Sequence, residues 1–393
     1  MVVFADEQRG TEQIDGEESM SIPWDQERIQ AVFYRRRSIS EELAEPLPSR
    51  PRPRGRWVLA ERIIVPNISG QMTQMPNGDL VAPIAGKFSH SSDGGRTWKP
   101  IEGINFPGDG HQDGMGFLNS GRWLIAVVTS NQPWSYGGHT EMGLVGGYRT
   151  FKREGQAADR HITFWHSDDQ GKTWTDSKPF KGPFKWVSPS VSHFIESDDG
   201  SIALPVFGCV TDEDMGSYSS SNGVVRSHDG GKTWGDFSFV FRTQPPGPDD
   251  YQPEPRYSEM DIAQLPNGHW VAFSRNERIT MGPAGWGSTK IALSTDLGRT
   301  WRRTGGSLRG VSQQKGVVLP DGGLALTWRA VSWQASGVAI TYDEGRSFDY
   351  LLTGPYETVN AFMHGTDEFV VFTSKSHRSD SSAGVYRWVL DEP

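Results

Sequence analysis

The chain has 393 residues, of which 22% are charged, and its formal net charge at pH 7 is −9. This acidic balance argues against a broad cationic surface for nucleic acid or for an anionic membrane. No apolar run approaches the roughly 20 residues that a membrane-spanning helix needs. The 46 glycines, 25 prolines and 15 tryptophans instead favour many short strands joined by turns.

The first 56 residues differ in composition from the rest. They are acidic at first, then basic at residues 35–37, then rich in proline at residues 46–54. Because proline fixes φ and has no N–H, this last stretch predicts an extended linker. Residues 29–34 are predicted either as a strand that closes the main domain or as a short arm onto a partner. We therefore divide the chain into an arm with a linker, residues 1–56, and a main domain, residues 57–393.

The start of the chain and its cysteine content bear on its compartment. The first residues lack a basic stretch followed by an apolar core, so no signal peptide is visible. Cys209 is the single cysteine and falls in a strand-like run, which favours a buried, inert thiol. A cytoplasmic protein is predicted, although a secreted protein whose signal had been removed would look the same.

Along the main domain, apolar segments flank turns that contain glycine. Asn-Gly or Asp-Gly between two apolar runs is the strongest short-range signal for a β-hairpin. Six copies can be aligned, the last of them degenerate, with turn glycines at Gly78, Gly121, Gly200, Gly268, Gly322 and Gly365.

After five of these hairpins the chain repeats a second pattern, Ser-x-Asp-x-Gly-x-Thr-Trp. The copies span residues 91–98, 167–174, 227–234, 294–301 and, as the weaker Thr-x-Asp-x-Gly-x-Ser-Phe, 341–348. The Asp is expected to accept backbone N–H groups in a tight turn, the Gly to adopt positive φ and the Trp to fold under the turn. Five copies of one turn predict a repeat architecture.

These repeats resemble the Asp-boxes of the sialidase (BNR-repeat) superfamily. The resemblance covers roughly residues 57–390 and implies an all-β, six-bladed β-propeller of the sialidase type. In that superfamily the boxes lie on the outer hairpin of each blade, far from the central pocket. They therefore indicate a scaffold, and function has to come from other residues.

The repeat also aligns positions around the propeller axis, because residues at one offset from the turn glycine are equivalent. Nine residues before it stand Ser69, Gln112, Val191, Glu259, Gln313 and Tyr356. Seven residues after it stand Ala85, Val128, Phe207, Arg275, Arg329 and Phe372. The polar members predict a central polar pocket. The alternative for the two arginines is that they are rim residues that pair with nearby carboxylates.

The resemblance assigns roles to three of these residues. In sialidases a Glu polarises a Tyr nucleophile, and an arginine triad holds the substrate carboxylate. The segments around Glu259, Tyr356 and Arg275 resemble the segments that carry the Glu, the Tyr and one triad Arg. The pairing is chemically reasonable, because a phenol with a reference pKa of about 10 needs a neighbouring base to act as a nucleophile at neutral pH.

The chain departs from the sialidase pattern at three places. Residues 65–70 replace the first triad Arg, with Ser69 in the aligned position, and Gln334 stands where the last triad Arg is expected. Residues 83–91 are too few to form the loop that usually carries the acid/base Asp. Arg329 is a possible substitute for a triad member. Gln112 and Gln313 are further candidates for substrate binding.

A replacement for the missing proton donor is predicted at residues 108–115. His111 and Asp113 lie there between glycines, and either is suited to general acid catalysis if it faces the pocket. The alternative is an ordinary Asx-rich turn. His193 and His364 are interpreted as structural. No metal-ligand spacing is visible, so no metal or cofactor is predicted.

Three functions remain after this comparison. The first is an exo-acting glycoside hydrolase that removes a terminal, acidic sugar, with Glu259 and Tyr356 at the reacting carbon. The second is a polysaccharide lyase or rhamnosidase-like enzyme on uronate-containing glycans, with His111 or Tyr356 and the arginines. The third is a propeller that binds carbohydrate without catalysis. In each case the expected partner is a carbohydrate, and the sequence leaves the sugar, the linkage and the oligomeric state open.

Overall fold

The computed structural model describes residues 55–66, 68, 71–104, 107, 112–130, 139–145, 148–153, 160–190, 193–211, 220–243, 256–277, 288–309, 311–312, 315–330, 336–354, 357–374 and 381–390, for some of them the backbone alone. All of them lie in the unit Arg35–Pro393. These residues form 28 strands and no helix, so the predicted all-β class is confirmed. Among them there is accordingly no helix long and apolar enough to cross a membrane.

Most strands form small antiparallel sheets whose order follows the chain. The first sheet contains β2 (Thr73–Gln74), β3 (Leu80–Ile84), β4 (Lys87–Ser91) and β5 (Lys99–Pro100). Another four-stranded sheet contains β17 (Arg256–Gln264), β18 (Trp270–Glu277), β19 (Ser288–Ser294) and β20 (Arg302–Arg309). The next sheet contains β21 (Val311–Ser312), β22 (Gly316–Val318), β23 (Leu324–Ala330), β24 (Ser336–Thr341) and β25 (Asp349–Gly354).

A nine-stranded sheet joins two successive repeats of the chain. Its strands are β6 (Gln112–Phe117), β7 (Trp123–Ser130), β10 (Arg160–Ser167), β11 (Thr175–Asp176), β12 (Trp186–Pro189), β13 (Ile195–Glu196), β14 (Ile202–Cys209), β15 (Ser221–Ser227) and β16 (Asp236–Phe241). The halves meet at one parallel pair, Arg160 opposite Trp186. The two-stranded hairpin of β8 (His139–Val145) and β9 (Tyr148–Arg153) is inserted between β7 and β10. Cys209 is buried at the end of β14, as expected.

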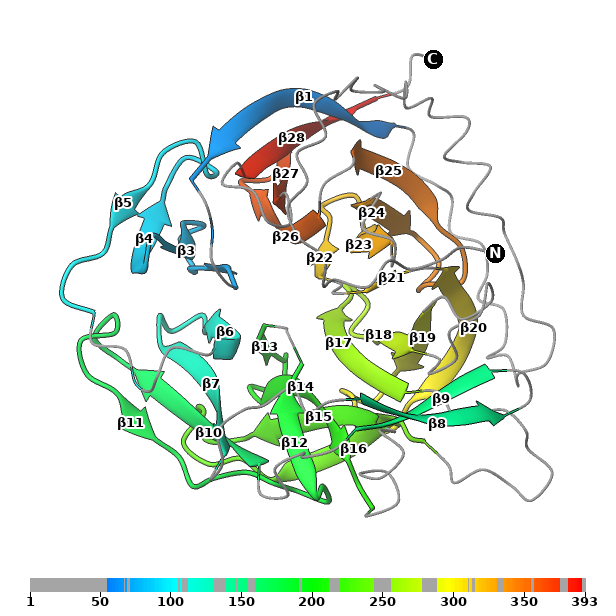
Figure 1. The fold of residues 1–393 in the computed structure, drawn as a ribbon. Coiled ribbons are helices and arrows are strands. Elements are labelled where there is room, and N and C mark those ends of the chain that lie inside the picture. The colour runs from blue at the N-terminus through cyan, green and yellow to red at the C-terminus, as the bar shows by residue number, and fades with distance from the viewer. Residues whose placement is uncertain are drawn as a thin grey trace, which may run out of the picture. The chain divides into compact units, whose positions relative to one another are not determined.

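The last sheet combines the two ends of the described chain. It contains β26 (Glu357–His364), β27 (Glu368–Ser374), β28 (Ser381–Val389) and β1 (Arg56–Val65). β1 pairs antiparallel with β28 from Arg56 opposite Val389 to Val65 opposite Ser381. A strand from the beginning of the main domain therefore completes the sheet formed by its end (Figure 1). Residues 29–34, one predicted closing strand, lie outside the described residues.

Six strands, one from each aligned repeat, surround a common centre (Figure 1). Residues of β2, β6, β13, β17, β22 and β26 line the same cavity. Each leads into the aligned turn glycine of its repeat, so this part of every repeat faces the centre and the strands that follow the turn lie outside it.

The hairpin that follows β17 shows why the aligned turns form. Gly268 N donates to Leu265 O at 2.8 Å, and Leu265 N donates to His269 O at 2.8 Å. Pro266 at the second turn position supplies its preferred φ, and Gly268 adopts φ 81°. The other five aligned glycines also have positive φ: Gly78, Gly121, Gly200, Gly322 and Gly365. The six predicted turns are confirmed.

The five repeated turns lie between the last two strands of a repeat and share one hydrogen-bond pattern. In the second copy Ser167 Oγ donates to Asp169 Oδ1 at 2.8 Å, and Thr173 donates its N–H to Oδ1 at 2.9 Å and its hydroxyl to Oδ2 at 2.6 Å. Trp174 Nε1 donates to Gly171 O at 3.0 Å. One carboxylate thus organises the whole turn, as predicted.

The same pattern predicts a loss of stability in acid. Partial burial alone would raise the pKa of Asp229, but hydrogen bonds from Thr233 and Ser227 outweigh it and lower this pKa from 3.8 to about 2. Because the folded pKa lies below the unfolded one, the stabilisation is complete above pH 4 and disappears as the pH falls towards 2. We expect Asp229→Ala to lower the free energy of unfolding by about 1–2 kcal/mol at pH 7. Urea titrations at pH 7 and pH 2.5 test this, because the difference between wild type and variant should shrink at the lower pH. A difference of the same size at both values contradicts it.

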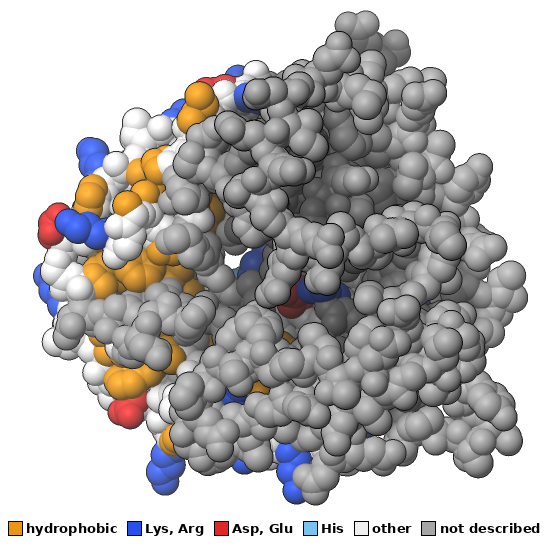
Figure 2. Space-filling model, in the orientation of Figure 1, with side chains coloured by type: hydrophobic (Ala, Val, Ile, Leu, Met, Phe, Trp, Pro, Cys, Tyr) orange, Lys and Arg blue, Asp and Glu red, His pale blue; other side chains and the backbone are white. Residues whose placement is uncertain are grey.

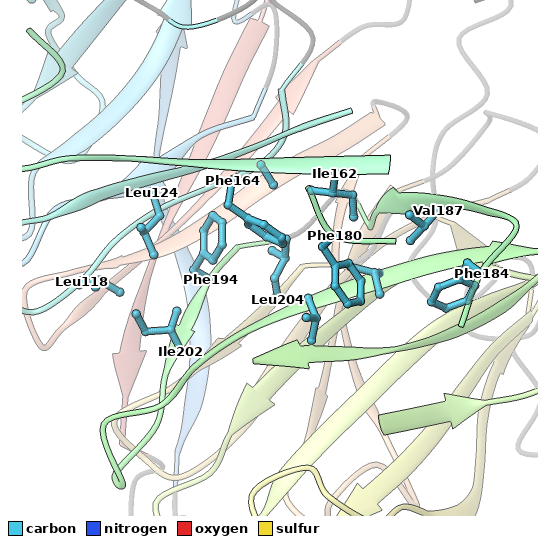
Figure 3. Close-up of a cluster of buried hydrophobic side chains, with 13 residues drawn as sticks. Leu118, Leu124, Ile162, Phe164, Phe180, Phe184, Val187, Phe194, Ile202 and Leu204 are labelled. Atoms are coloured by element: carbon cyan, nitrogen blue, oxygen red, sulfur yellow. The ribbon is translucent and has the colours of Figure 1, made fainter. Parts of the chain in front are cut away.

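The halves of the nine-stranded sheet are held together by a buried apolar cluster (Figure 3). Phe164 on β10 stacks on Trp234 with ring centroids 4.1 Å apart, and Phe194 and Leu204 pack beside it. Full burial of one such side chain contributes about 1.5–3 kcal/mol. The cluster therefore fixes β10 and β14 relative to each other, although their sheet halves share only one backbone pair.

Candidate functional site

Strand β17 turns one row of side chains toward its own core and the other toward β22 and the cavity. Met260 and Ile262 are buried in an apolar cluster with residues of the preceding sheet. Ala263 lines the cavity. Because side chains alternate along a strand, Asp261 and Glu259 share the face of Ala263. β17 therefore presents two carboxylates, two residues apart, on its cavity face.

The neighbouring strand β18 places an arginine beside the first of these carboxylates. Asp261 lies opposite Phe273, so Arg275, two residues further on, occupies the face that also carries Glu259. Arg275 Nη1 donates to Glu259 Oε2 at 2.7 Å, and the two side chains are only 23% and 16% exposed. A short, charge-assisted contact with so little access to water is stronger than a surface ion pair.

A β-bulge aims Glu259 at Arg275. The register of β17 and β18 shifts between Tyr257 and Met260. Bulges of this kind redirect side chains next to functional sites. Tyr257 N donates to Ser220 O at 2.9 Å, and Ser220 Oγ donates to Tyr257 O at 2.7 Å. Asn222 Nδ2 donates to Ser274 Oγ at 2.6 Å from β15. The bulge is thus held by buried contacts from the preceding sheet.

A second group of ionisable residues, formed by Asp261, His193 and Lys315, lies around the position two residues after Glu259 on β17. Asp261 is completely buried, and its Oδ2 accepts the Gly316 N–H at 3.0 Å. His193 Nδ1 lies 3.3 Å from the same oxygen. Lys315, which precedes Gly316, is buried as well. Burial lowers the pKa of Lys315 from 10.5 to about 8, although Asp261 and Glu259 act in the opposite direction.

This second group borders the cavity at the centre, which has a volume of about 630 Å³. Figure 2 shows acidic and basic side chains together in the central hollow of the viewed face. The wall mixes apolar side chains with polar and acidic ones. Its side chains include Met72, Thr73, Gln74, Phe117, His193, Phe194, Ile195, Glu196, Asp198, Ala263, Gln264, Leu265, Lys315, Val317, Asn360, Phe362 and Met363. The cavity therefore combines apolar surface with several convergent polar groups, as small-molecule sites do.

Of the candidate residues predicted from the sequence, the structure brings Glu259 and Arg275 together. Gln112 and Asp113 lie in β6, where the register shifts between Gln112 and Gly114, and Arg329 lies in β23; for these three the structure describes the backbone. Asp113 therefore lies in a strand and not in the turn of the alternative interpretation. The other five candidates lie outside the described residues: Ser69, His111, Gln313, Gln334 and Tyr356.

The two remaining histidine predictions have different outcomes. His364 ends β26 beside the turn at Gly94, where an added Cβ would lie 3.0 Å from the His364 ring, and this agrees with a structural role. His193 lines the cavity beside Asp261. The short connection predicted between residues 83 and 91 is confirmed, because only Ala85 and Gly86 separate β3 from β4.

The sequence alignment did not identify Asp261 and Lys315, because it compared the position nine residues before each turn glycine and not the position seven residues before it. Seven residues before the turn glycine, instead of nine, stand Gln71, Gly114, His193, Asp261, Lys315 and Thr358. The signal was available: three adjacent repeats carry His, Asp and Lys at this offset. Polar residues at both positions, nine and seven residues before the turn glycine, indicate a polar site that extends further along the strands than one such position would.

No three His, Cys, Asp or Glu side chains within the described ranges are arranged to hold a metal ion. The ionisable groups of the two neighbouring sets on β17 and its partners are two carboxylates, a guanidinium, an ammonium and an imidazole. Such a set can hold an anionic or hydroxyl-rich ligand and accept or donate protons.

No protein-family model matches the sequence, and no curated protein matches it. Solved structures do resemble the fold. A protein of unknown function from Dyadobacter fermentans is 17% identical with a TM-score of 0.56, and the match covers 85% of this chain and 99% of that one. The Hadza microbial sialidase Hz136 is 15% identical with a TM-score of 0.52, over 83% of this chain and 66% of that one.

A third structure is the GH93 α-L-arabinofuranosidase of Fusarium graminearum, solved with arabinobiose. It is 16% identical with a TM-score of 0.51, over 84% of this chain and 98% of that one. At these identities the likeness concerns the fold. The chain thus has the all-β fold that sialidases and GH93 arabinofuranosidases share, and its chemistry has to be argued from its own site.

Proposed function

We propose that this chain is an exo-acting glycoside hydrolase that removes a terminal, acidic sugar, and that its described site is the Glu259–Arg275 pair. The observation that carries the proposal is the 2.7 Å contact between these two side chains on the inward face of β17 and β18. A carboxylate and a guanidinium in direct contact supply a proton acceptor and an anion-binding group at one place.

The scaffold in this proposal is a six-bladed propeller of the sialidase type with Asp-box turns. Support comes from the six aligned hairpins, from the five repeated turns that share their Asp-centred hydrogen bonds and from the six strands, one from each repeat, that line one cavity. Pairing of β1 with β28 also supports it, because it completes the last repeat with a strand from the beginning. On such a scaffold the central pocket is the expected place for a ligand.

In the proposed reaction Glu259 acts as the base of a Tyr nucleophile. The Tyr356 oxygen attacks the anomeric carbon while Glu259 takes the phenol proton, and the glycosidic oxygen leaves with a proton from His111 or Asp113. Water then attacks the same carbon, gives one proton back to His111 or Asp113 and releases the tyrosine oxygen, which regains its proton from Glu259. Tyrosine nucleophiles are a recognised exception among glycosidases. Tyr356 and His111 lie outside the described residues. The role of Tyr356 rests on the sequence resemblance, and that of His111 rests on its place between glycines at residues 108–115.

Arg275 has two tasks in this scheme. Its 2.7 Å contact with Glu259 holds in place the carboxylate that has to accept the proton. A guanidinium carries five N–H donors, so the same group can also serve a carboxylate or hydroxyls of the sugar. This dual use explains why an acidic sugar is the favoured substrate class.

The test is a screen of chromogenic glycosides and oligosaccharides with acidic or neutral terminal sugars, with product masses as readout. We expect a free acidic monosaccharide from the non-reducing end. An ultraviolet-absorbing unsaturated uronate would replace the proposal by a lyase. Glycan binding with no product after long incubation would replace it by a non-catalytic propeller.

A further inference from the structure

His193 and Asp261 form a contact that the proposed reaction does not use. His193 Nδ1 lies 3.3 Å from Asp261 Oδ2, close enough for an ion pair when the imidazole is protonated. Asp261 is completely buried, whereas the His193 side chain is 35% exposed and lines the central cavity. The contact therefore joins a carboxylate that has no access to water to an imidazole that a ligand in the cavity can reach.

Asp261 is placed so that it can fix the orientation of this imidazole. Its Oδ2 accepts the Gly316 N–H at 3.0 Å, and its chain neighbours Met260 and Ile262 are packed in an apolar cluster, so the carboxylate is held from two strands. An imidazole whose Nδ1 is turned to a fixed carboxylate leaves Nε2 for the cavity that the ring lines. A buried Asp that orients a His through Nδ1 is a recurring arrangement for proton transfer.

The other ionisable side chains that line the cavity are less suited to this task. Glu196 and Asp198 come three and five residues after His193, towards the hairpin turn, which places Glu196 about 10 Å further along the chain. Glu196 Oε2 already accepts a backbone N–H at 2.7 Å, and Asp198 Oδ2 accepts a side-chain amide at 2.7 Å. Lys315 is buried, so it presents less of its surface to a ligand than His193 does.

His193 also contacts the strand that carries Glu259, close to that residue. Asp261 follows Glu259 by two residues on β17, so their Cα atoms are about 7 Å apart. Because His193 touches Asp261, its imidazole and the Glu259 carboxylate are separated by a distance of the same order. The two ionisable groups that flank a scissile glycosidic bond are commonly about 5–10 Å apart. One sugar is therefore large enough to meet both groups.

We propose that His193 is a further catalytic residue of the glycosidase, the general acid that protonates the leaving oxygen, and that Asp261 is its positioning residue. The inference rests on the proposed function of Glu259. It assigns to His193 the proton transfer for which the sequence names His111 or Asp113. The observation that carries it is the 3.3 Å contact between a fully buried carboxylate and an imidazole on the cavity wall.

The protons balance over both steps of this reaction. As the Tyr356 oxygen bonds to the anomeric carbon, its proton passes to Glu259. The bond from that carbon to the glycosidic oxygen breaks, its electron pair stays on the oxygen, and the oxygen takes a proton from His193 Nε2. In the second step a water oxygen bonds to the carbon and gives one proton to His193. The bond to Tyr356 then breaks, and its oxygen regains the proton from Glu259.

The leaving group provides the test. Two glycosides of the sugar that wild type releases are compared: a dinitrophenyl glycoside, whose phenolate leaves without a proton, and a methyl glycoside, whose oxygen needs one. His193→Gln should lower kcat/KM about 10²–10⁴-fold for the methyl glycoside and less than about tenfold for the dinitrophenyl glycoside. Asp261→Asn keeps an oxygen for the Gly316 N–H but loses the charge that attracts the ring, so it should show the same dependence to a smaller degree.

A matched control is available in another His–Asp contact. His228 Nε2 lies 3.0 Å from Asp236 Oδ2, but its side chain is 53% exposed and it is not among the described residues that line the cavity. His228→Gln should therefore match wild type on both glycosides. Circular dichroism and thermal melting show whether each variant is folded. A role of His193 in folding alone would lower kcat/KM equally for the two leaving groups.

Equal loss on both glycosides in a folded His193→Gln variant overturns the proposal. It is also overturned if the dependence on the leaving group is absent from His193→Gln and appears instead in Lys315→Met, His111→Gln or Asp113→Asn. In that case the proton comes from the residue whose variant shows the dependence.

The same assays separate this inference from the proposed function. If wild type hydrolyses no glycoside, both are rejected. If wild type is active and Glu259→Gln is slow, but His193→Gln treats the two leaving groups alike, the role of His193 fails alone. If His193→Gln depends on the leaving group while Glu259→Gln turns over like wild type, the role of Glu259 fails and that of His193 stands.

Discussion

Glu259→Gln should lower kcat by about 10²–10⁴-fold, the usual contribution of a positioned acid or base. The amide has nearly the shape of the carboxylate and can still accept the Arg275 N–H that now reaches Glu259 Oε2 at 2.7 Å. What it cannot do is take a proton from a nucleophile. The variant should therefore bind substrate with a KM close to that of wild type and turn it over slowly. Steady-state kinetics on the substrate identified in the screen measure both constants.

The matched control is Glu102→Gln, which removes an exposed carboxylate outside the cavity. Its kcat should equal that of wild type. Circular dichroism and thermal melting should show that Glu259→Gln is folded. A folded Glu259→Gln variant with wild-type turnover would remove Glu259 from the mechanism.

Arg275→Met should affect both binding and stability. Loss of the guanidinium leaves Glu259 without its 2.7 Å partner in a place where the two side chains are only 16% and 23% exposed. Breaking a buried pair from one side costs about 3–5 kcal/mol, and the partial exposure moves our expectation to about 2–3 kcal/mol of unfolding free energy. KM for an acidic sugar should rise about 10–100-fold, because the anion loses a guanidinium partner. Urea unfolding and steady-state kinetics measure the two effects.

Two variants make this expectation specific. Arg275→Lys keeps the charge but not the planar fork, so it should fall between wild type and Arg275→Met in both assays. Arg299→Met removes a pair with Asp199 that is 3.5 Å long and largely exposed, and it should cost about 0–1 kcal/mol. If Arg275→Met were as stable as Arg299→Met and had a wild-type KM, the pair would be a rim contact without a functional role.

The turns were predictable because their causes are local. In each copy of the repeated motif the Asp carboxylate accepts hydrogen bonds from residues within four positions of it. Each aligned turn requires positive φ at one position, and a glycine stands there. The place of Glu259 on its strand could be predicted from its fixed offset from Gly268, but the direction of its side chain is set by the bulge between Tyr257 and Met260. Arg275 followed from the antiparallel partner strand of the same hairpin.

The rest of the site depends on contacts that a linear pattern does not contain. The bulge that aims Glu259 is held by Ser220 and Asn222, which lie 37 and 36 residues away from their partners in β17. The link between Asp261 and Gly316 crosses from one sheet to the next, a separation of 55 residues. Closure of the last sheet by β1 is likewise a pairing between distant segments. Such pairings depend on how whole repeats pack against one another. The sequence alignment could therefore identify Glu259 as a residue that faces the centre, but not the residues of other repeats that contact this part of β17.

The most direct test of the central claim is hydrolysis in water enriched in ¹⁸O, followed by mass analysis of the sugar released from an acidic oligosaccharide. Wild type should release a monosaccharide that carries one ¹⁸O atom, since water ends the reaction at the anomeric carbon. Glu259→Gln should release it at least a hundredfold more slowly, in line with the loss of a catalytic base. An unsaturated product without ¹⁸O, or equal release by the two proteins, would contradict a hydrolase built around Glu259.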